Sequence, residues 1–206
     1  MFEDGAVSSP MKKANPTLIT LILGILVLLG IWAYREFAPV QLQGTPVQAM
    51  PVIPEIELTD TNGQPRKIQD SEGIKLVFFG FTRCPDVCPA TMSILKRAYE
   101  GAGKPQNVKV FLVSVDPDTD TPEVLKAYVD KFQSDFVGLT GDADNIAKLA
   151  NAFYVGFNEN PDGIVTHTDT VAVLDEQNRM RLIYNQEKLG KGLLDQDLPA
   201  LVRGSL

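Results

Sequence analysis

Cysteine and histidine are scarce in this chain of 206 residues, which contains two cysteines and one histidine. These counts exclude a zinc finger, an iron–sulfur cluster held by protein thiolates and a disulfide-dense secreted scaffold. Basic residues are also in the minority, since 19 lysines and arginines face 26 aspartates and glutamates and the net charge is −7. A broad phosphate-binding surface, and with it nucleic-acid binding, is therefore not expected. Any soft metal or redox chemistry must use Cys84, Cys88 and His167.

Charge is absent from residues 17–34, which read TLITLILGILVLLGIWAY. As a helix this segment is roughly 27 Å long, close to the thickness of the hydrocarbon core of a bilayer. Trp32 and Tyr34 suit the membrane interface, and the two lysines before the run favour a cytoplasmic N-terminus. A cleavable signal peptide is the alternative, but no small-residue cleavage site follows the run. The pattern predicts a transmembrane anchor over 17–37, after a cytoplasmic tail over 1–16.

The predicted orientation places the rest of the chain on the periplasmic side of the inner membrane. Residues 38–53 are rich in proline, glutamine and valine without periodicity, which predicts an extended tether. A single acidic domain is then expected over 54–206.

Strand and helix patterns alternate in this domain. Asn62-Gly63 between two short strand patterns predicts a β-hairpin at its start. Apolar runs over 76–79 and 110–115 are typical of strands covered on both faces, and a helical period over 89–99 lies between them. These three segments predict parallel strands joined by a helix.

The second half of the domain continues the alternation. Thr121-Pro122-Glu123 is typical of a helix start, with a hydroxyl cap before a proline in the first turn. The remaining predicted elements are a strand over 136–139, a helix from Asp142 or Asp144 to 153, an irregular segment over 158–163, strands over 170–174 and 180–184, and a helix within 193–202 whose continuity Pro199 limits. This order predicts an α/β domain with a thioredoxin-like fold and an added N-terminal β-hairpin, preceded by one transmembrane helix.

Both cysteines lie in the string FGFTRCPDVCP, directly after the first apolar strand and at the start of its helix. Open α/β sheets place their sites at this edge. Backbone amides and the positive end of the helix dipole favour thiolates there, so the pKa of both Cys84 and Cys88 is expected to be lowered. The pair can oxidise to a disulfide or converge on one metal ion. An inert staple is the alternative, although a bridge that closes so short a loop stabilises little.

The string CPDVCP after FGFTR, followed by VSVDPDTDTPE and by a histidine just before a strand, resembles the Sco/SenC family of thioredoxin-fold copper proteins. The resemblance covers about residues 52–201 and implies that Cys84, Cys88 and His167 are copper ligands. Two thiolates and an imidazole suit Cu(I), and the same set can hold Cu(II) with an added oxygen ligand. Zinc would fit these donors too, so the identity of the metal rests on the resemblance.

Asp116 ends the second central strand, at the edge of the sheet that carries the cysteines. The resemblance implies that it lies close to the metal site, where it would order the ligand loop or accept a hydrogen bond. A capping or turn aspartate is the alternative. Asp118, Asp120 and Glu123 are expected to be solvated loop and cap charges, and Met92 is expected in the core.

The chain departs from the family pattern at Thr166, where an aspartate is common, and Asp169 is a candidate substitute. No proline stands at Thr168, beside the histidine, where thioredoxins carry a proline that faces the dithiol. A proline there would crowd out a metal ion, so its absence is compatible with a metal site.

The resemblance implies a membrane-anchored copper metallochaperone that helps to assemble the dinuclear copper centre of cytochrome c oxidase. Its implied partners are the copper-binding subunit of that oxidase and another copper chaperone. The alternative is a thiol–disulfide reductase that uses Cys84 and Cys88 to keep the oxidase cysteines reduced, and the two roles can coexist. A peroxiredoxin-like peroxidase is disfavoured by the close spacing of the cysteines. The leading hypothesis is thus a carrier of metal and not an enzyme.

Overall fold

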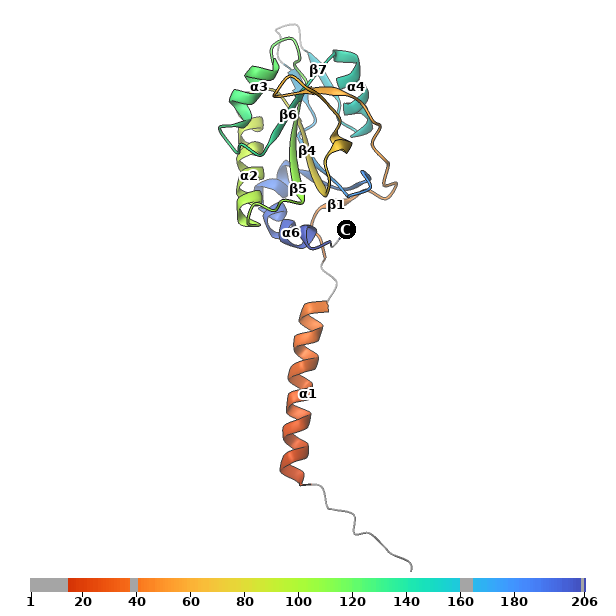
Figure 1. Cartoon of the computed structure of the whole chain (residues 1–206), viewed down its shortest axis with the longest axis vertical. Helices are drawn as coiled ribbons and strands as arrows, with labels where there is room; N and C mark the ends of the chain where they lie inside the picture. Colours follow the sequence, from red (N-terminus) through yellow and green to blue (C-terminus); the bar gives the residue numbers. More distant parts are fainter. Residues whose placement is uncertain (1–14, 38–40, 160–164, 205) are drawn as a thin grey trace, which may run out of the picture. The chain divides into compact units, whose positions relative to one another are not determined.

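A computed structural model of the chain describes residues 15–37, 41–159, 165–204 and 206. The chain divides into two units, Met1–Gln41 and Leu42–Leu206 (Figure 1). The first unit contains α1 (Pro16–Phe37), at the position of the predicted anchor.

Apolar side chains of α1 are exposed along its described length, for example Leu21 by 65% and Leu28 by 68%. Within the part of the chain that the structure describes, no helix is long and apolar enough to cross a membrane. The helix therefore forms where the sequence predicts it, but its transmembrane character is not confirmed.

The second unit contains the remaining helices and strands. Its strands are β1 (Thr45–Pro46), β2 (Leu58–Asp60), β3 (Pro65–Arg66), β4 (Ile74–Gly80), β5 (Val108–Ser114), β6 (Val137–Thr140), β7 (Phe157–Glu159), β8 (Val165–His167), β9 (Thr170–Leu174) and β10 (Met180–Asn185). Its helices are the 3₁₀ helix η1 (Ile68–Asp70), α2 (Val87–Gly101), α3 (Pro122–Val129), α4 (Ala143–Ala152), α5 (Gln186–Gly190) and α6 (Leu193–Val202).

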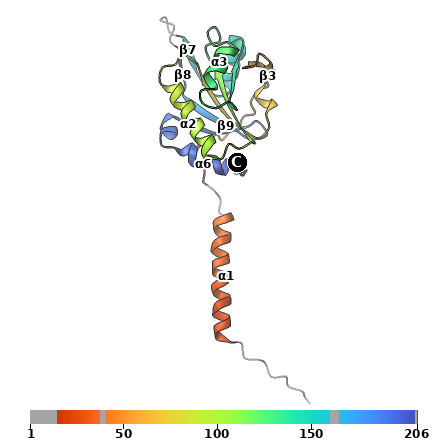
Figure 2. The same ribbon diagram turned by 60° about the vertical axis from the view of Figure 1, so that its left-hand side comes forward.

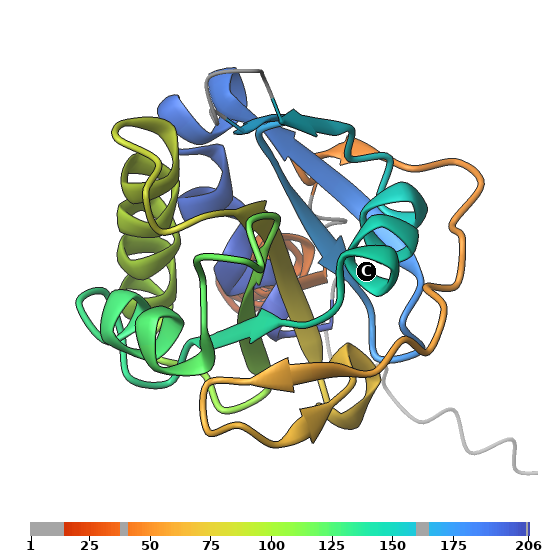
Figure 3. The ribbon, with the colours of Figure 1, turned by 90° about the horizontal axis from the view of Figure 1, so that it is seen from above.

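Eight of these strands form one mixed sheet in the order β1-β10-β9-β4-β5-β6-β2-β3. Strands β4, β5 and β6 run parallel, β9 and β10 pair antiparallel on one side, and the β2–β3 hairpin joins β6 on the other. Helices α2, α3 and α6 cover one face of the sheet and α4 covers the other (Figure 3). Helices α2 and α6 lie side by side (Figure 2). The predicted α/β alternation and the added N-terminal hairpin are confirmed.

Local signals in the sequence account for several of these boundaries. The Thr121 side chain caps α3 by accepting a hydrogen bond from the amide of Val124, and Asp142 caps α4 in the same way. Strand β4 is buried along its whole length, as its unbroken apolar run predicts. Met92 is fully buried on α2, which confirms its place in the core.

Other segments differ from expectation because tertiary contacts shape them. Asn158 and Glu159, predicted as irregular, belong to β7, which pairs with β8; residues 160–163 of the same predicted segment lie outside the described residues. Helix α6 includes Pro199 within its span. The second unit begins at Leu42 and includes most of the segment predicted as tether: β1 pairs with β10, and Ile53 is buried.

Asp197 of α6 fixes the start of this unit. Its Oδ2 atom accepts hydrogen bonds from the backbone amides of Gln43 at 2.6 Å and Gly44 at 3.0 Å, and from the hydroxyl of Tyr184 at 2.5 Å. The carboxylate is 3% exposed, so water cannot readily replace it as the acceptor for these groups.

The substitution Asp197→Ala should therefore lower the free energy of unfolding by about 1–3 kcal/mol, since it leaves buried donors without an acceptor. Asp195→Ala on the same helix is the matched control, because it removes a carboxylate from the first turn of α6 that forms a solvent-accessible ion pair with Arg97 at 2.7 Å, and it should cost about 0–1 kcal/mol. Urea unfolding of the full chain measures both. Equal losses of unfolding free energy in the two variants would contradict the proposed role of Asp197 in fixing the start of the second unit.

Candidate functional site

The two cysteines lie where β4 gives way to α2. Cys84 is half-buried in the connecting loop, and Cys88 is fully buried in the first turn of the helix. The two cysteines are not joined by a disulfide bond. The backbone amide of Cys88 donates a hydrogen bond to Sγ of Cys84 at 3.3 Å, so the amide at the start of the helix is directed at the more exposed sulfur.

Gly80, the last residue of β4, makes room for the buried sulfur. A Cβ atom at this position would lie 3.1 Å from Sγ of Cys88 and 2.9 Å from the ring of Phe78. Any side chain here would press on the sulfur. The missing side chain thus lets Cys88 pack against the carboxyl end of the central strand.

Burial raises the pKa of Cys88, and the hydrogen bond with Cys84 raises it further. The prediction of a lowered pKa is therefore wrong for Cys88. The physical reason is that desolvation of a thiolate outweighs the favourable backbone groups at the start of α2. A soft cation bound between the sulfurs would reverse the balance, because a coordinated thiol is deprotonated.

His167 is placed by the topology of its strands. Strand β9 runs antiparallel to β4 with Val171 opposite Phe78, so residues that precede β9 lie beyond the carboxyl end of β4. His167 ends β8, three positions before β9 begins, and this is the edge that carries the cysteines. The negative charge of Asp169 contributes to the raised pKa of Cys88, which puts this segment near the buried thiol.

The side chain of His167 lies outside the described part of the structure, so its role as a ligand stays a prediction. Among the side chains that are described, no group of three or more histidine, cysteine, aspartate or glutamate residues could hold a metal ion. The described part of the candidate site therefore consists of two sulfur donors.

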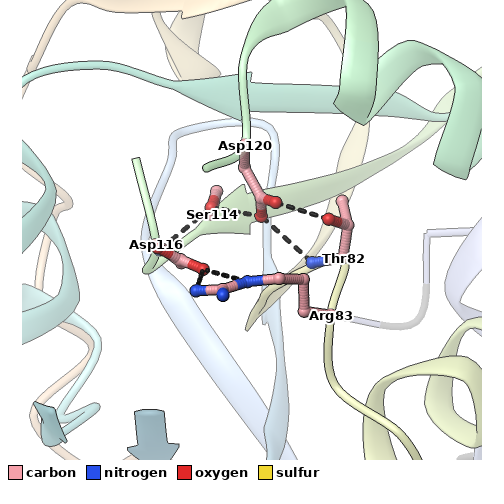
Figure 4. Close-up of polar contacts among 5 residues, drawn as sticks. All are labelled: Thr82, Arg83, Ser114, Asp116 and Asp120. Carbon is pink, nitrogen blue, oxygen red and sulfur yellow. Dashed lines mark hydrogen bonds and ion pairs between the residues drawn. The ribbon is translucent and has the colours of Figure 1, made fainter. Parts of the chain in front are cut away.

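Asp116 follows β5 and contacts the residue next to Cys84. Its Oδ2 atom accepts hydrogen bonds from Nη2 of Arg83 at 2.7 Å and Nε at 3.2 Å (Figure 4). The Arg83 side chain is 57% exposed, whereas that of Asp116 is only 10% exposed. The carboxylate thus orients a surface cation next to the half-buried cysteine in the sequence, and its role at a metal site stays a prediction.

Asp120 differs from its prediction as a solvated charge, because it is fully buried. Its Oδ2 atom accepts from the amide of Thr82 at 3.0 Å and from the hydroxyl of Ser114 at 2.7 Å, and its Oδ1 atom accepts from the hydroxyl of Thr82 at 2.5 Å (Figure 4). Its two acidic neighbours in the sequence, Asp118 and Glu123, are exposed as predicted. An acidic run in the sequence carries no signal that tells which of its members turns inward.

Tyr128 of α3 is a second residue whose setting the sequence does not reveal. It belongs to the apolar stripe of its helix and is 8% exposed, yet its buried hydroxyl has no hydrogen-bond partner among the described residues. Burial raises the pKa of Tyr128, and the negative charges of Cys88 and Cys84 raise it further. The hydroxyl is therefore close enough to the dithiol to sense its charge.

Comparison with known proteins gives a consistent result. The sequence profile described as SCO1/SenC matches residues 45–201. An SCO2-like protein of Rickettsia felis is 27% identical over 183 residues, which cover 81% of this chain and 89% of that protein.

Two solved structures illustrate the similarity in fold. The structure of Bradyrhizobium japonicum ScoI with copper bound has a TM-score of 0.64 and 28% identity, and the match covers 76% of this chain and all of that one. BsSco, a member of the Sco family of cytochrome c oxidase assembly proteins in which a disulfide switch was identified, has a TM-score of 0.62 and 21% identity over 80% of this chain and 98% of its own.

The contrast between the two thiols predicts their order of reaction. At neutral pH an alkylating reagent should modify Cys84 well before Cys88. Cys88 is buried, and its raised pKa keeps the side chain protonated, a form that does not react with the reagent. Raising the pH should speed the reaction of Cys88, since the thiolate fraction grows as the pH approaches the raised pKa. Mass spectrometry of quenched samples locates the label.

Alkylation in urea is the control, because both thiols are then solvated and should react alike. Faster labelling of Cys88 than of Cys84 in the folded chain would contradict the assignment.

Proposed function

Since this chain belongs to the SCO1/SenC family, we propose that it is a metallochaperone that binds copper and delivers it to the dinuclear copper centre of cytochrome c oxidase. Cys84, Cys88 and His167 are the proposed ligands. Copper is the cargo of this function, so it must both bind and leave.

The observation that carries the proposal is the pair of unbridged cysteines, four residues apart in the sequence, between the carboxyl end of β4 and the first turn of α2. The hydrogen bond from the amide of Cys88 to Sγ of Cys84 at 3.3 Å holds the loop so that both sulfurs belong to one site. Two thiolates and an imidazole are donors that suit copper in both oxidation states. The residues present therefore fit the cargo.

Unequal burial of the two sulfurs supports delivery. Cys84 is half-buried, so a thiolate of a partner protein can reach a metal that this residue holds. Cys88 is fully buried and retains its hold while the exchange begins. The proposed partners are the copper-binding subunit of the oxidase as acceptor and another copper chaperone as donor. Asp116 assists by fixing the guanidinium of Arg83 beside the exchanging sulfur.

A thiol–disulfide reductase that acts on the oxidase cysteines is the second candidate, favoured by a pair of cysteines at the start of a helix that no disulfide bridges. The thiolate of Cys84 would attack a disulfide of the partner and form a mixed disulfide, releasing one partner thiolate. Cys88 would then attack the mixed disulfide, so that this chain is oxidised and the partner fully reduced. The partial exposure of Cys84 suits it to the first step.

Anaerobic copper titration of the full chain with both thiols reduced tests the metal site. We expect one tightly bound copper per chain, and Cu(II) should give a sulfur-to-copper charge-transfer absorption. His167→Ala should abolish stable Cu(II) binding while disulfide formation between Cys84 and Cys88 continues. Cys84→Ser should abolish both, because one sulfur can neither complete the site nor form the bridge.

The two candidate functions give different results in this titration. Unchanged copper affinity in His167→Ala would remove the imidazole from the site. No copper binding by the wild-type chain, together with a disulfide that cycles readily, would make the chain a reductase.

We propose in addition that α1 attaches the protein to the inner membrane, with the second unit on the periplasmic side. The exposed apolar side chains of α1 support this, since Ile25, Leu26 and Leu29 are each more than half exposed and need an apolar environment. The two lysines before the helix favour a cytoplasmic N-terminus.

Cell fractionation with and without the first 41 residues tests the attachment. The full chain should stay in the membrane fraction after an alkaline wash, whereas the shortened chain should be released. Protease added to spheroplasts should digest the second unit if it lies outside the cytoplasm. Resistance to protease would reverse the proposed orientation.

A further inference from the structure

Asp120 lies at a junction of three segments that the sequence keeps apart. Its carboxylate accepts hydrogen bonds from Thr82 in the loop that leads to Cys84 and from Ser114 at the end of β5. The next residue, Thr121, caps α3. One buried side chain thus ties the cysteine loop to the central sheet and to the start of a helix (Figure 4).

The bonds at this junction use both carboxylate oxygens. The hydroxyl of Ser114 donates to Asp120 and also accepts from the amide of Asp116 at 3.1 Å. Asp116 in turn holds Arg83. Two carboxylates therefore bind consecutive residues immediately before Cys84: Asp120 binds Thr82, and Asp116 binds Arg83. Ser114 connects the Thr82–Asp120 contact with the Arg83–Asp116 contact.

The two contacts differ in exposure to solvent. The Arg83–Asp116 pair includes a guanidinium that is largely in water, so solvent and salt weaken it. The Thr82–Asp120 bonds measure 2.5 Å and 3.0 Å, and the Asp120 side chain is completely buried. A buried hydrogen bond holds its geometry because breaking it leaves polar groups without partners. The buried Thr82–Asp120 contact is thus the one that sets the position of the loop.

We propose that Asp120 is a positioning residue of the dithiol site, acting through Thr82 to hold the loop in the conformation in which Sγ of Cys84 converges with Sγ of Cys88. This inference rests on the proposed function in one respect, which is that copper is the ion bound at the site. Groups that orient metal ligands typically contribute 10- to 100-fold to metal affinity. Loss of the carboxylate should therefore weaken copper binding by about 10- to 100-fold.

The carboxylate is required, and an amide is not equivalent. Asp120 accepts three hydrogen bonds, two on Oδ2 and one on Oδ1. An asparagine has one acceptor oxygen, and its NH₂ group would face a donor of Thr82 or Ser114. Asp120→Asn therefore preserves the volume but disrupts the contact with Thr82.

Four variants of the full chain in detergent micelles separate positioning from general stability. Asp120→Asn and Thr82→Val disrupt the Thr82–Asp120 contact, and Thr82→Val keeps the size of the side chain while removing its hydroxyl. Thr82→Ser restores the hydroxyl. Asp118→Asn makes the same chemical change as Asp120→Asn on an exposed residue of the same loop.

Three readouts are compared in these variants: copper affinity by competition with a chelator, the charge-transfer absorption of the Cu(II) form, and the equilibrium of the dithiol with glutathione. In the last, two protein thiols reduce one glutathione disulfide to two glutathione thiols and form the Cys84–Cys88 bridge. Urea unfolding is measured alongside. A merely structural role would lower the unfolding free energy but leave the absorption band and the glutathione equilibrium of the folded chain unchanged.

We expect Asp120→Asn and Thr82→Val to bind copper about 10- to 100-fold more weakly, with a displaced absorption band and a changed glutathione equilibrium. Thr82→Ser and Asp118→Asn should match the wild-type chain. Wild-type values in both Asp120→Asn and Thr82→Val would overturn the proposal. If Asp120→Asn does not fold, Thr82→Val decides alone.

The glutathione equilibrium separates the failure of this inference from that of the proposed function. A wild-type chain that takes no copper would refute the metallochaperone function. A glutathione equilibrium that still changes in Thr82→Val would then uphold the positioning role of the Thr82–Asp120 contact, and an unchanged one would refute it.

Discussion

The parallel register of β4 and β5 is the constraint on which the site depends. It pairs Gly80 with Ser114, the last residues of the two strands. The loops that follow these strands therefore start side by side, although they lie far apart in the sequence. One loop carries the cysteines and the other carries Asp116 and Asp120. A shift of register by one residue would move Ser114 away from the cysteine loop and turn its side chain to the other face of the sheet.

The same edge imposes a conflict between burial and reactivity. Gly80 lets the sulfur of Cys88 pack into the core, and burial then raises the pKa of this thiol. A thiol of this kind is a poor nucleophile when no metal is bound but a good metal ligand, because only a bound cation makes its deprotonation favourable. Cys84 stays half-buried and remains available to partners. Unequal burial thus divides the labour between two residues that the sequence presents as equivalent.

Much of the fold could be predicted because its signals are local. The runs that become β4 and β5, the hairpin at Asn62-Gly63 and the cap at Thr121 each depend on neighbouring residues alone. What could not be predicted depends on contacts across the sheet. Asp120 lies in the string DPDTDTPE, and only its contacts with Thr82 and Ser114 distinguish it from an ordinary loop aspartate.

The candidate site divides along the same line. The cysteines and their edge of the sheet could be predicted because their strand and helix flank them in the sequence. The pKa of Cys88 could not, since it depends on how deeply the first turn of α2 sinks into the core. The inward-facing hydroxyl of Tyr128 could not be predicted for a similar reason, nor could the hydrogen bond by which Asp197 fixes the start of the second unit. An apolar stripe does not show where its one polar atom points, and a proline-rich segment resembles a tether whether or not it packs.

Charge at the site completes the argument. Two thiolates around Cu(I) carry a net charge of −1, in a protein that is already acidic. Arg83 is the cation adjacent to this charge in the sequence, and Asp116 holds its guanidinium at 2.7 Å. The carboxylate therefore both orients the cation and cancels its charge, so the bound metal gains little net stabilisation from Arg83. The proposed metallochaperone function needs this compromise, because a strongly stabilised anionic complex would hold its copper against transfer. Under the two proposals, the buried Asp120 would preserve the geometry of the ligands, and the exposed Arg83–Asp116 pair would leave the charge open to adjustment by a partner. Holding the ligands and releasing the metal would then depend on different carboxylates.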